Sequence, residues 1–147
     1  GMPIKELKEI SPELRDNIRS YMPAFGSPLN PVDISGTATS DMYGGALKTA
    51  YRDENVDGIM ISVCPTAVTD VEAITETVIN IYRQYKNLGK PFIMECQGGN
   101  ECRNAIMKLR DSGIPAYSTP EQAVNAMVAL RRYSHIMNKK EQLIKNI

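Results

Sequence analysis

The stretch Ile59–Asp70, which reads IMISVCPTAVTD, decides the fold of this chain. Its first five residues, Ile59–Val63, are apolar or small and too few for a helix, which is typical of a central strand in a parallel sheet. Pro65 cannot donate a ladder hydrogen bond, so we expect the strand to stop before it. Thr69 stands three residues before Glu72, the spacing of a capping box. The stretch therefore predicts a strand, a short loop and a helix.

Such a strand–loop–helix unit points its loop and the first N–H groups of its helix outward at the carboxyl edge of the sheet. Ligands of open α/β sheets bind at that edge, and a helix N-terminus favours anions there. A helix that is simply well capped would show the same pattern, so the pattern marks a candidate site without proving one.

The composition limits the kinds of partner. The 147 residues suit one ordinary domain, and 17 basic residues balance 17 acidic residues. No basic run occurs, so a nucleic-acid partner is not expected. There is no recognisable signal peptide and no apolar run of membrane-spanning length, so we expect a cytoplasmic protein with no membrane partner.

The cysteines and the histidine argue against several chemistries. Three cysteines cannot all pair and form no CxxC motif, and Cys64 and Cys96 each end a predicted strand. Without a nearby histidine to activate them, we expect these two to be buried thiols rather than nucleophiles. The single histidine, His135, cannot by itself supply a metal site or a catalytic triad. We therefore expect no catalytic residue and no metal in this chain.

The remaining sequence alternates between strand and helix patterns. Gly44 and Gly45 lie inside one expected helix and suggest a close packing contact. The fold class expected is α/β, with three layers and a doubly wound, mainly parallel sheet, and we favour a flavodoxin-like strand order. Expected strands cover 32–35, 59–63, 91–96 and 114–118; expected helices cover 5–22 and 40–52 and follow Thr69, Asn100 and Thr119.

Several short motifs follow one another in an order that resembles one enzyme family. Asn30–Thr39 reads NPVDISGTAT, and Pro65–Asp70 reads PTAVTD. Further matching elements are Val56–Gly58, Lys90-Pro91, Gly98-Gly99, Gly113–Pro115, Thr119–Ala123 and Arg132-Tyr133. In this order the motifs resemble the nucleoside-diphosphate-forming acyl-CoA synthetases, the relatives of succinyl-CoA synthetase.

The resemblance implies the flavodoxin-like domain of the succinyl-CoA synthetase type, over residues 30–138. A leading helix and connector (1–29) would pack on this domain, and an extension or linker (139–147) would follow it. The implied reaction converts acyl-CoA, ADP and phosphate into acid, CoA and ATP through a phosphohistidine, with an acetyl-like acyl group. The CoA-binding, phosphohistidine and ATP-grasp domains would be partners, and CoA and ADP or ATP with Mg would bind there, with no cofactor on this domain alone.

The resemblance also implies which residues form the site. A helix of this domain points its N-terminus at the phosphohistidine of a partner domain, which places phosphate binding at the backbone of Thr66, Ala67, Val68 and Thr69. His135 matches no phosphohistidine motif. Loop or domain contacts would involve six residues: Asn30, Asp33, Gly36, Thr37, Gly98 and Gly99.

Two other functions fit the same pattern. The loop Ser35–Thr39 has small hydroxyl residues around a glycine, as does the loop that holds the FMN phosphate in flavodoxins. The first alternative is therefore a flavodoxin-like protein that binds FMN or a small anion. The chain has no Trp, and no aromatic residue stands in the loops where a flavin ring would stack, which argues against FMN. The second alternative is a non-catalytic regulatory module of a protein lysine acetyltransferase, because that family carries the same set of domains.

Overall fold

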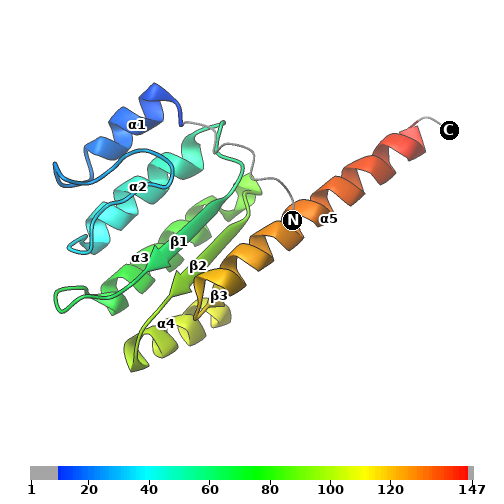
Figure 1. Ribbon diagram of the computed structural model, residues 1–147. Helices are drawn as coiled ribbons and strands as arrows, with labels where there is room; N and C mark the ends of the chain where they lie inside the picture. Colours follow the sequence, from blue (N-terminus) through cyan, green and yellow to red (C-terminus); the bar gives the residue numbers. More distant parts are fainter. Residues whose placement is uncertain (1–9, 146–147) are drawn as a thin grey trace.

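The computed structural model describes residues 10–145 and has a parallel sheet with helices on both faces (Figure 1). Its strands are β1 (Ile59–Val63), β2 (Phe92–Cys96) and β3 (Ala116–Tyr117), hydrogen-bonded in the order β1-β2-β3. Both pairs are parallel, with Ile61 opposite Met94. Three of the four expected strands are thus confirmed.

The fourth expected strand, Val32–Ser35, is wrong. It forms no part of the sheet, and only an isolated antiparallel bridge joins Asp33 to Ser27. The carboxylate of Asp33 accepts from the Ser35 amide at 2.8 Å, and Ser35 takes a left-handed φ of 78°. This local turn bends the chain out of the extended conformation. The flavodoxin-like order is therefore not confirmed, because the three strands simply follow the chain.

Two helices cover one face of the sheet and a third covers the other. Helix α3 (Val71–Tyr85) lies beside α4 (Asn100–Asp111), and α4 packs on β2 and β3. Helix α5 (Pro120–Lys145) also packs on β2 and β3, and in Figure 1 it crosses in front of the sheet. All five residues of β2 are buried, as expected of a strand between two layers of helices.

Two further helices extend the layer that contains α3. Helix α2 (Ser40–Arg52) packs on α3, and α1 (Pro12–Arg19) packs on α2. The side chain of Ser11 caps α1 and a proline occupies its first turn, as its sequence predicts. Helix α1 is shorter than the expected helix 5–22, of which residues 5–9 lie outside the described part of the chain.

The two glycines of α2 explain how these helices approach one another. A Cβ on Gly44 would lie 3.2 Å from Cγ2 of Thr77, a residue of α3. A Cβ on Gly45 would overlap the ring of Tyr21. The predicted close contact is confirmed, and its partners are α3 and the residue two positions after α1.

Glycines with a left-handed backbone conformation follow two of the helical segments. Helix α3 passes into a 3-10 turn, η1 (Lys86–Leu88), which ends at Gly89 with φ 71°. Gly113, with φ 80°, follows α4. Helix α5 continues without a break through residues 138 and 139, where the sequence suggested that the domain ends. Within residues 10–145, no helix is long and apolar enough to cross a membrane.

Candidate functional site

The carboxyl edge of the sheet brings together three loops that the sequence singled out. The carbonyl of Gly36 accepts from the hydroxyls of Thr66 and Thr69, at 3.0 and 3.4 Å. A Cβ on Gly98 would lie 3.5 Å from Cδ of Pro65, so the glycine loop adjoins the same place. Two of the expected contact residues, Gly36 and Gly98, therefore adjoin the loop that contains Thr66 and Thr69.

Three of the four amides of residues 66–69, in the loop before α3, are already hydrogen-bonded to Thr66 or Thr69. The amide of Thr66 donates to Oγ1 of Thr69 at 2.8 Å, and the amide of Val68 reaches Oγ1 of Thr66 at 3.4 Å. The amide of Thr69 donates to the carbonyl of Thr66 at 3.1 Å. Of the four residues expected to bind phosphate, only Ala67 has an amide without a partner among the described residues.

The cap of α3 is not the one that the sequence predicted. Asp70 caps the helix, and its Oδ1 accepts from the amide of Ala73 at 2.9 Å. The expected capping box of Thr69 with Glu72 is wrong, because the hydroxyl of Thr69 serves the amide of Thr66. The negative carboxylate lies against the positive end of the helix dipole and offsets much of its attraction for an anion.

The loop after Asp33 is held in shape by its own side chains. Asp33 accepts from the amide of Ser35, and the hydroxyls of Ser35 and Thr37 lie 3.1 Å apart. Asp33 therefore orients its own loop, while Asn30 and Thr37 are exposed to any partner. The left-handed φ of Ser35 costs an L-residue about 1–2 kcal/mol.

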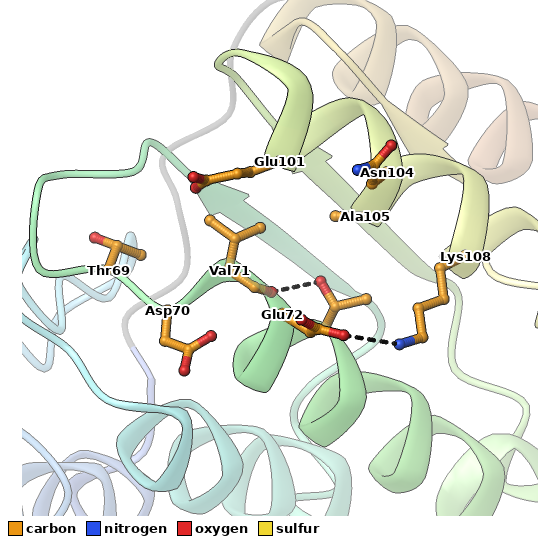
Figure 2. Close-up of a pocket in the computed structure, with 9 residues that line it drawn as sticks. Thr69, Asp70, Val71, Glu72, Glu101, Asn104, Ala105 and Lys108 are labelled. Carbon is orange, nitrogen blue, oxygen red and sulfur yellow. Dashed lines mark hydrogen bonds and ion pairs between the residues drawn. The ribbon is translucent and has the colours of Figure 1, made fainter.

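A cavity of about 470 Å³ opens beside the loop that precedes α3, between the N-terminal parts of α3 and α4 (Figure 2). Its lining includes three carboxylates and one lysine, among the residues Thr69, Asp70, Val71, Glu72, Thr75, Glu101, Asn104, Ala105 and Lys108. Lys108 donates a hydrogen bond to the carboxylate of Glu76, which raises the pKa of Lys108, and the negative charge of Glu76 offsets the charge of the lysine. The cavity is therefore acidic and unsuited to a phosphate group.

The cysteines differ from the expectation. Cys96, at the end of β2, forms a disulfide with Cys102 in the first turn of α4, with a Cα–Cα distance of 5.3 Å. Cys64 is free and exposed rather than buried. The two cysteines meet because the turn through Gly98 and Gly99 leads directly from the end of β2 to the first turn of α4.

Sequence reasoning missed a buried carboxylate on the sheet. Glu95, in β2, is 1% exposed, and its Oε2 accepts from the hydroxyl of Ser62 in β1 at 2.5 Å. Its other oxygen, Oε1, has no partner among the described residues. An acidic residue inside the apolar run PFIMEC was the available signal. Within residues 10–145, no group of His, Cys, Asp or Glu side chains could hold a metal ion.

The sequence comparisons agree on one class of enzyme. A family model described as the Ligase-CoA domain matches residues 4–139. The α subunit of acetate–CoA ligase [ADP-forming] I from Pyrococcus furiosus is 40% identical over 117 residues, which cover 78% of this chain and 25% of that protein. Acetate–CoA ligase [ADP-forming] I from Archaeoglobus fulgidus is 34% identical over 83% of this chain and 16% of its own length.

The structural comparisons agree with the sequence comparisons. The apo form of the dinucleotide forming acetyl-coenzyme A synthetase 1 of Ca. Korarchaeum cryptofilum superposes with a TM-score of 0.82 and 32% identity. The match covers 88% of this chain and 28% of that one. The same synthetase in complex with phosphate and ADP gives a TM-score of 0.80. This chain thus spans between 16% and 28% of the length of these relatives.

Proposed function

The chain belongs to the Ligase-CoA domain family of ADP-forming acyl-CoA synthetases, related to succinyl-CoA synthetase, and we propose that it presents its loop 64–69 to a phosphohistidine of a partner domain. The enzyme would convert acyl-CoA, ADP and phosphate into acid, CoA and ATP, with an acetyl-like acyl group. The synthetase of Ca. Korarchaeum cryptofilum has been solved with phosphate and ADP. In the enzyme that contains this chain, CoA, nucleotide and Mg would bind to other domains.

The position of the loop is the single observation that carries this proposal. The loop lies at the carboxyl edge of a parallel sheet, where α/β proteins bind ligands. Its tip is open to a partner, since the side chain of Val68 is 72% exposed and Ala67 is also exposed. The amide of Ala67 has no partner among the described residues, and the hydroxyls of Thr66 and Thr69, which flank it in the sequence, lie 3.0 Å apart.

The cap of α3 shifts the contact from the helix end to the loop tip. Asp70 would repel a phosphoryl group that approached the first turn of α3, and the acidic cavity beside it would do the same. The amide of Ala67 is a neutral donor at the exposed tip of the loop, whereas the hydroxyls of Thr66 and Thr69 donate to the carbonyl of Gly36. A phosphoryl group would therefore meet residues 66–69 rather than the helix axis.

Exposed apolar residues near the site support its docking against another domain. Phe25 is 76% exposed and Leu29 is 54% exposed, and both stand in the connector that leads to Asn30. Large exposed apolar side chains next to candidate contact residues are typical of an interface. We propose that Asn30, Asp33, Gly36, Thr37, Gly98 and Gly99 lie at the same domain boundary.

The test places a negative charge at the tip of the loop. In the assembled synthetase, Ala67→Asp would lie beside the phosphoryl group, and Ala67→Ser is the matched neutral control. At about 6 Å and an effective dielectric constant of about 40, each pair of unit charges costs about 1.4 kcal/mol. The phosphoryl group carries two negative charges, so the partner histidine should gain or lose it roughly 100-fold more slowly. Formation and decay of the phosphohistidine in the partner domain, followed with radiolabelled phosphate, measure this rate.

Two results would contradict the proposal. One is a normal phosphoryl-transfer rate in Ala67→Asp with the fold intact by circular dichroism. The other is CoA-dependent ATP formation by the purified 147-residue chain alone, because it lacks a candidate phosphohistidine. The Ala67→Ser control should keep a rate close to that of the parent.

A further inference from the structure

A disulfide closes the turn between β2 and α4. It joins Cys96, the last residue of β2, to Cys102 in the first turn of α4, six residues further along the chain. The stabilisation that a disulfide gives by restricting the unfolded chain is smaller when the loop it closes is short. The domain also has a buried apolar core of its own around the sheet and α3. The bond therefore acts mainly on the turn that it encloses.

The start of α4 lacks the side-chain cap that the other α-helices have. A first-turn amide donates to a capping side chain in α1, α2, α3 and α5, where the caps are Ser11, Thr39, Asp70 and Thr119. At α4 the N-cap is Gly99, and within residues 10–145 no side chain caps this helix. Glycine also leaves the backbone before the helix less restricted than any other residue would. The disulfide thus restrains the first turn of α4 where a capping side chain would otherwise do so.

The same turn packs against the loop that we propose as the phosphate site. A Cβ on Gly98 would lie 3.0 Å from Sγ of Cys102 and 3.5 Å from Cδ of Pro65. Gly98 therefore lies between the disulfide and the beginning of the loop 64–69. The amide of Gln97 also donates to the carbonyl of Val63 at 2.9 Å, which joins the ends of β2 and β1. A movement of the turn would change the packing around Pro65.

The cover over the disulfide is a turn with few side chains. Cys96 and Cys102 are each 1% exposed, whereas Gly98 and Gly99 are exposed. Gly98 has no side chain between its backbone and Sγ of Cys102. Exposed turns of this kind open locally at a small cost in free energy. Such an opening would give a thiol reductant access to the sulfur atoms.

We propose that the Cys96–Cys102 bond is a redox-controlled clasp on the loop 64–69. A dithiol reductant breaks the S–S bond: two electrons and two protons pass to the cysteine sulfurs, and the dithiol becomes a disulfide. With the bond formed, the turn holds Pro65 in place. With the bond broken, the uncapped first turn of α4 frays and the loop loses this support. The effect on phosphoryl transfer rests on the proposed function, whereas the effect on the turn does not.

Amide hydrogen exchange in the 147-residue chain, before and after reduction with dithiothreitol, tests the clasp. The amides of Gln97 and Arg103 report on the turn, because their backbone hydrogen bonds lie at its two ends. We expect both amides to exchange at least about tenfold faster after reduction. The amides of Ile59 and Met94 donate within the sheet and are the internal controls, whose exchange should stay the same.

A matched pair of variants separates the disulfide from other effects of the reductant. Cys64→Ser removes the free, exposed thiol and keeps the bond, so the two reporter amides should respond to reduction as in the parent. Cys64→Ser combined with Cys102→Ala cannot form the bond, so its reporter amides should exchange at the faster rate with and without reductant. If this double variant does not fold, Cys96→Ala replaces Cys102→Ala and removes the bond from the strand side.

Phosphoryl transfer in the assembled synthetase connects the clasp to the site. In the Cys64→Ser background, the phosphohistidine of the partner domain should form and decay about tenfold more slowly after reduction, because small misplacements of a positioning group reduce rates by this order or more. The variant without the bond should transfer at the slower rate in both redox states. This variant also controls for thiols elsewhere in the synthetase.

Three results would overturn the proposal. Equal exchange of the Gln97 and Arg103 amides in the two redox states would refute the clasp. A redox response that persists in the variant without the bond would assign the effect to another thiol. An exchange response with an unchanged transfer rate would refute the control of the site. Failure of the proposed function has a different signature, because Ala67→Asp would then transfer normally while reduction still changed the exchange of the two amides.

Discussion

The hydrogen bond between the exposed Ser62 and the buried Glu95 gives the sharpest test of the energetics of the sheet. In the variant Ser62→Ala, the carboxylate of Glu95 loses its one donor among the described residues and stays 1% exposed. Leaving a buried acceptor without its hydrogen bond costs about 1–3 kcal/mol. Because Ser62 itself is exposed, water can partly replace its hydroxyl, so we expect a loss of about 1.5 kcal/mol in the free energy of unfolding.

A double-mutant cycle separates this hydrogen bond from other effects of the substitution. Glu95→Met keeps a side chain of similar length and removes the unsatisfied oxygen, so it should be neutral or stabilising. In that background, Ser62→Ala should change stability by less than about 0.5 kcal/mol, as is usual for an exposed position. The coupling energy should therefore exceed about 1 kcal/mol.

Urea unfolding followed by far-ultraviolet circular dichroism measures all four proteins of the cycle. The comparison requires equal denaturant slopes, since a change in slope would indicate an altered unfolded state. The reasoning is refuted if the two substitutions are additive, or if Glu95→Met is strongly destabilising. The second result would mean that the carboxylate makes a favourable interaction that the geometry does not show.

Three other predictions test separate features of the chain. Under non-reducing conditions the unfolded protein should show one reactive thiol, that of Cys64, and reduction of the Cys96–Cys102 bond should raise the count to three. Gly113→Ala should destabilise the protein by about 1–2 kcal/mol in urea unfolding, because φ at this residue is 80° and the space around it is open, so only backbone strain contributes. Burial raises the pKa of Tyr51 above its usual 10.0. The stabilisation of the folded state by the neutral phenol is therefore fully present below pH 10.0, and it is lost as the pH rises through the folded-state pKa. Tyr51→Phe should reduce this alkaline loss in unfolding curves measured between neutral pH and pH 10–11, and an unchanged pH dependence would contradict it.

The main elements of the fold could be read from the sequence because their signals are local. The apolar run Ile59–Val63 and the proline after it act within a few residues, and the structure confirms the strand and the position of its end. The close approach of Gly44 to a neighbouring helix was also predictable, because glycine inside a helix is costly without a packing reason.

The errors arose where two local preferences compete. Val32–Ser35 has the composition of a strand, but the carboxylate of Asp33 binds the Ser35 amide and turns the chain. Thr69 has the spacing of a cap, but its hydroxyl is used by Thr66, and the next residue caps the helix instead. Sequence patterns list the possible partners of a side chain without deciding between them.

The sequence by itself determined the α/β class, the three parallel strands and the family, because periodicity and ordered motifs depend only on neighbouring residues. The tertiary structure alone decided which side chains meet across the sheet. It paired Cys96 with Cys102, buried Glu95 against Ser62 and joined two of the loop amides to threonine hydroxyls. These contacts depend on register and on the packing of distant segments, and residue spacing along a single chain does not encode either of them.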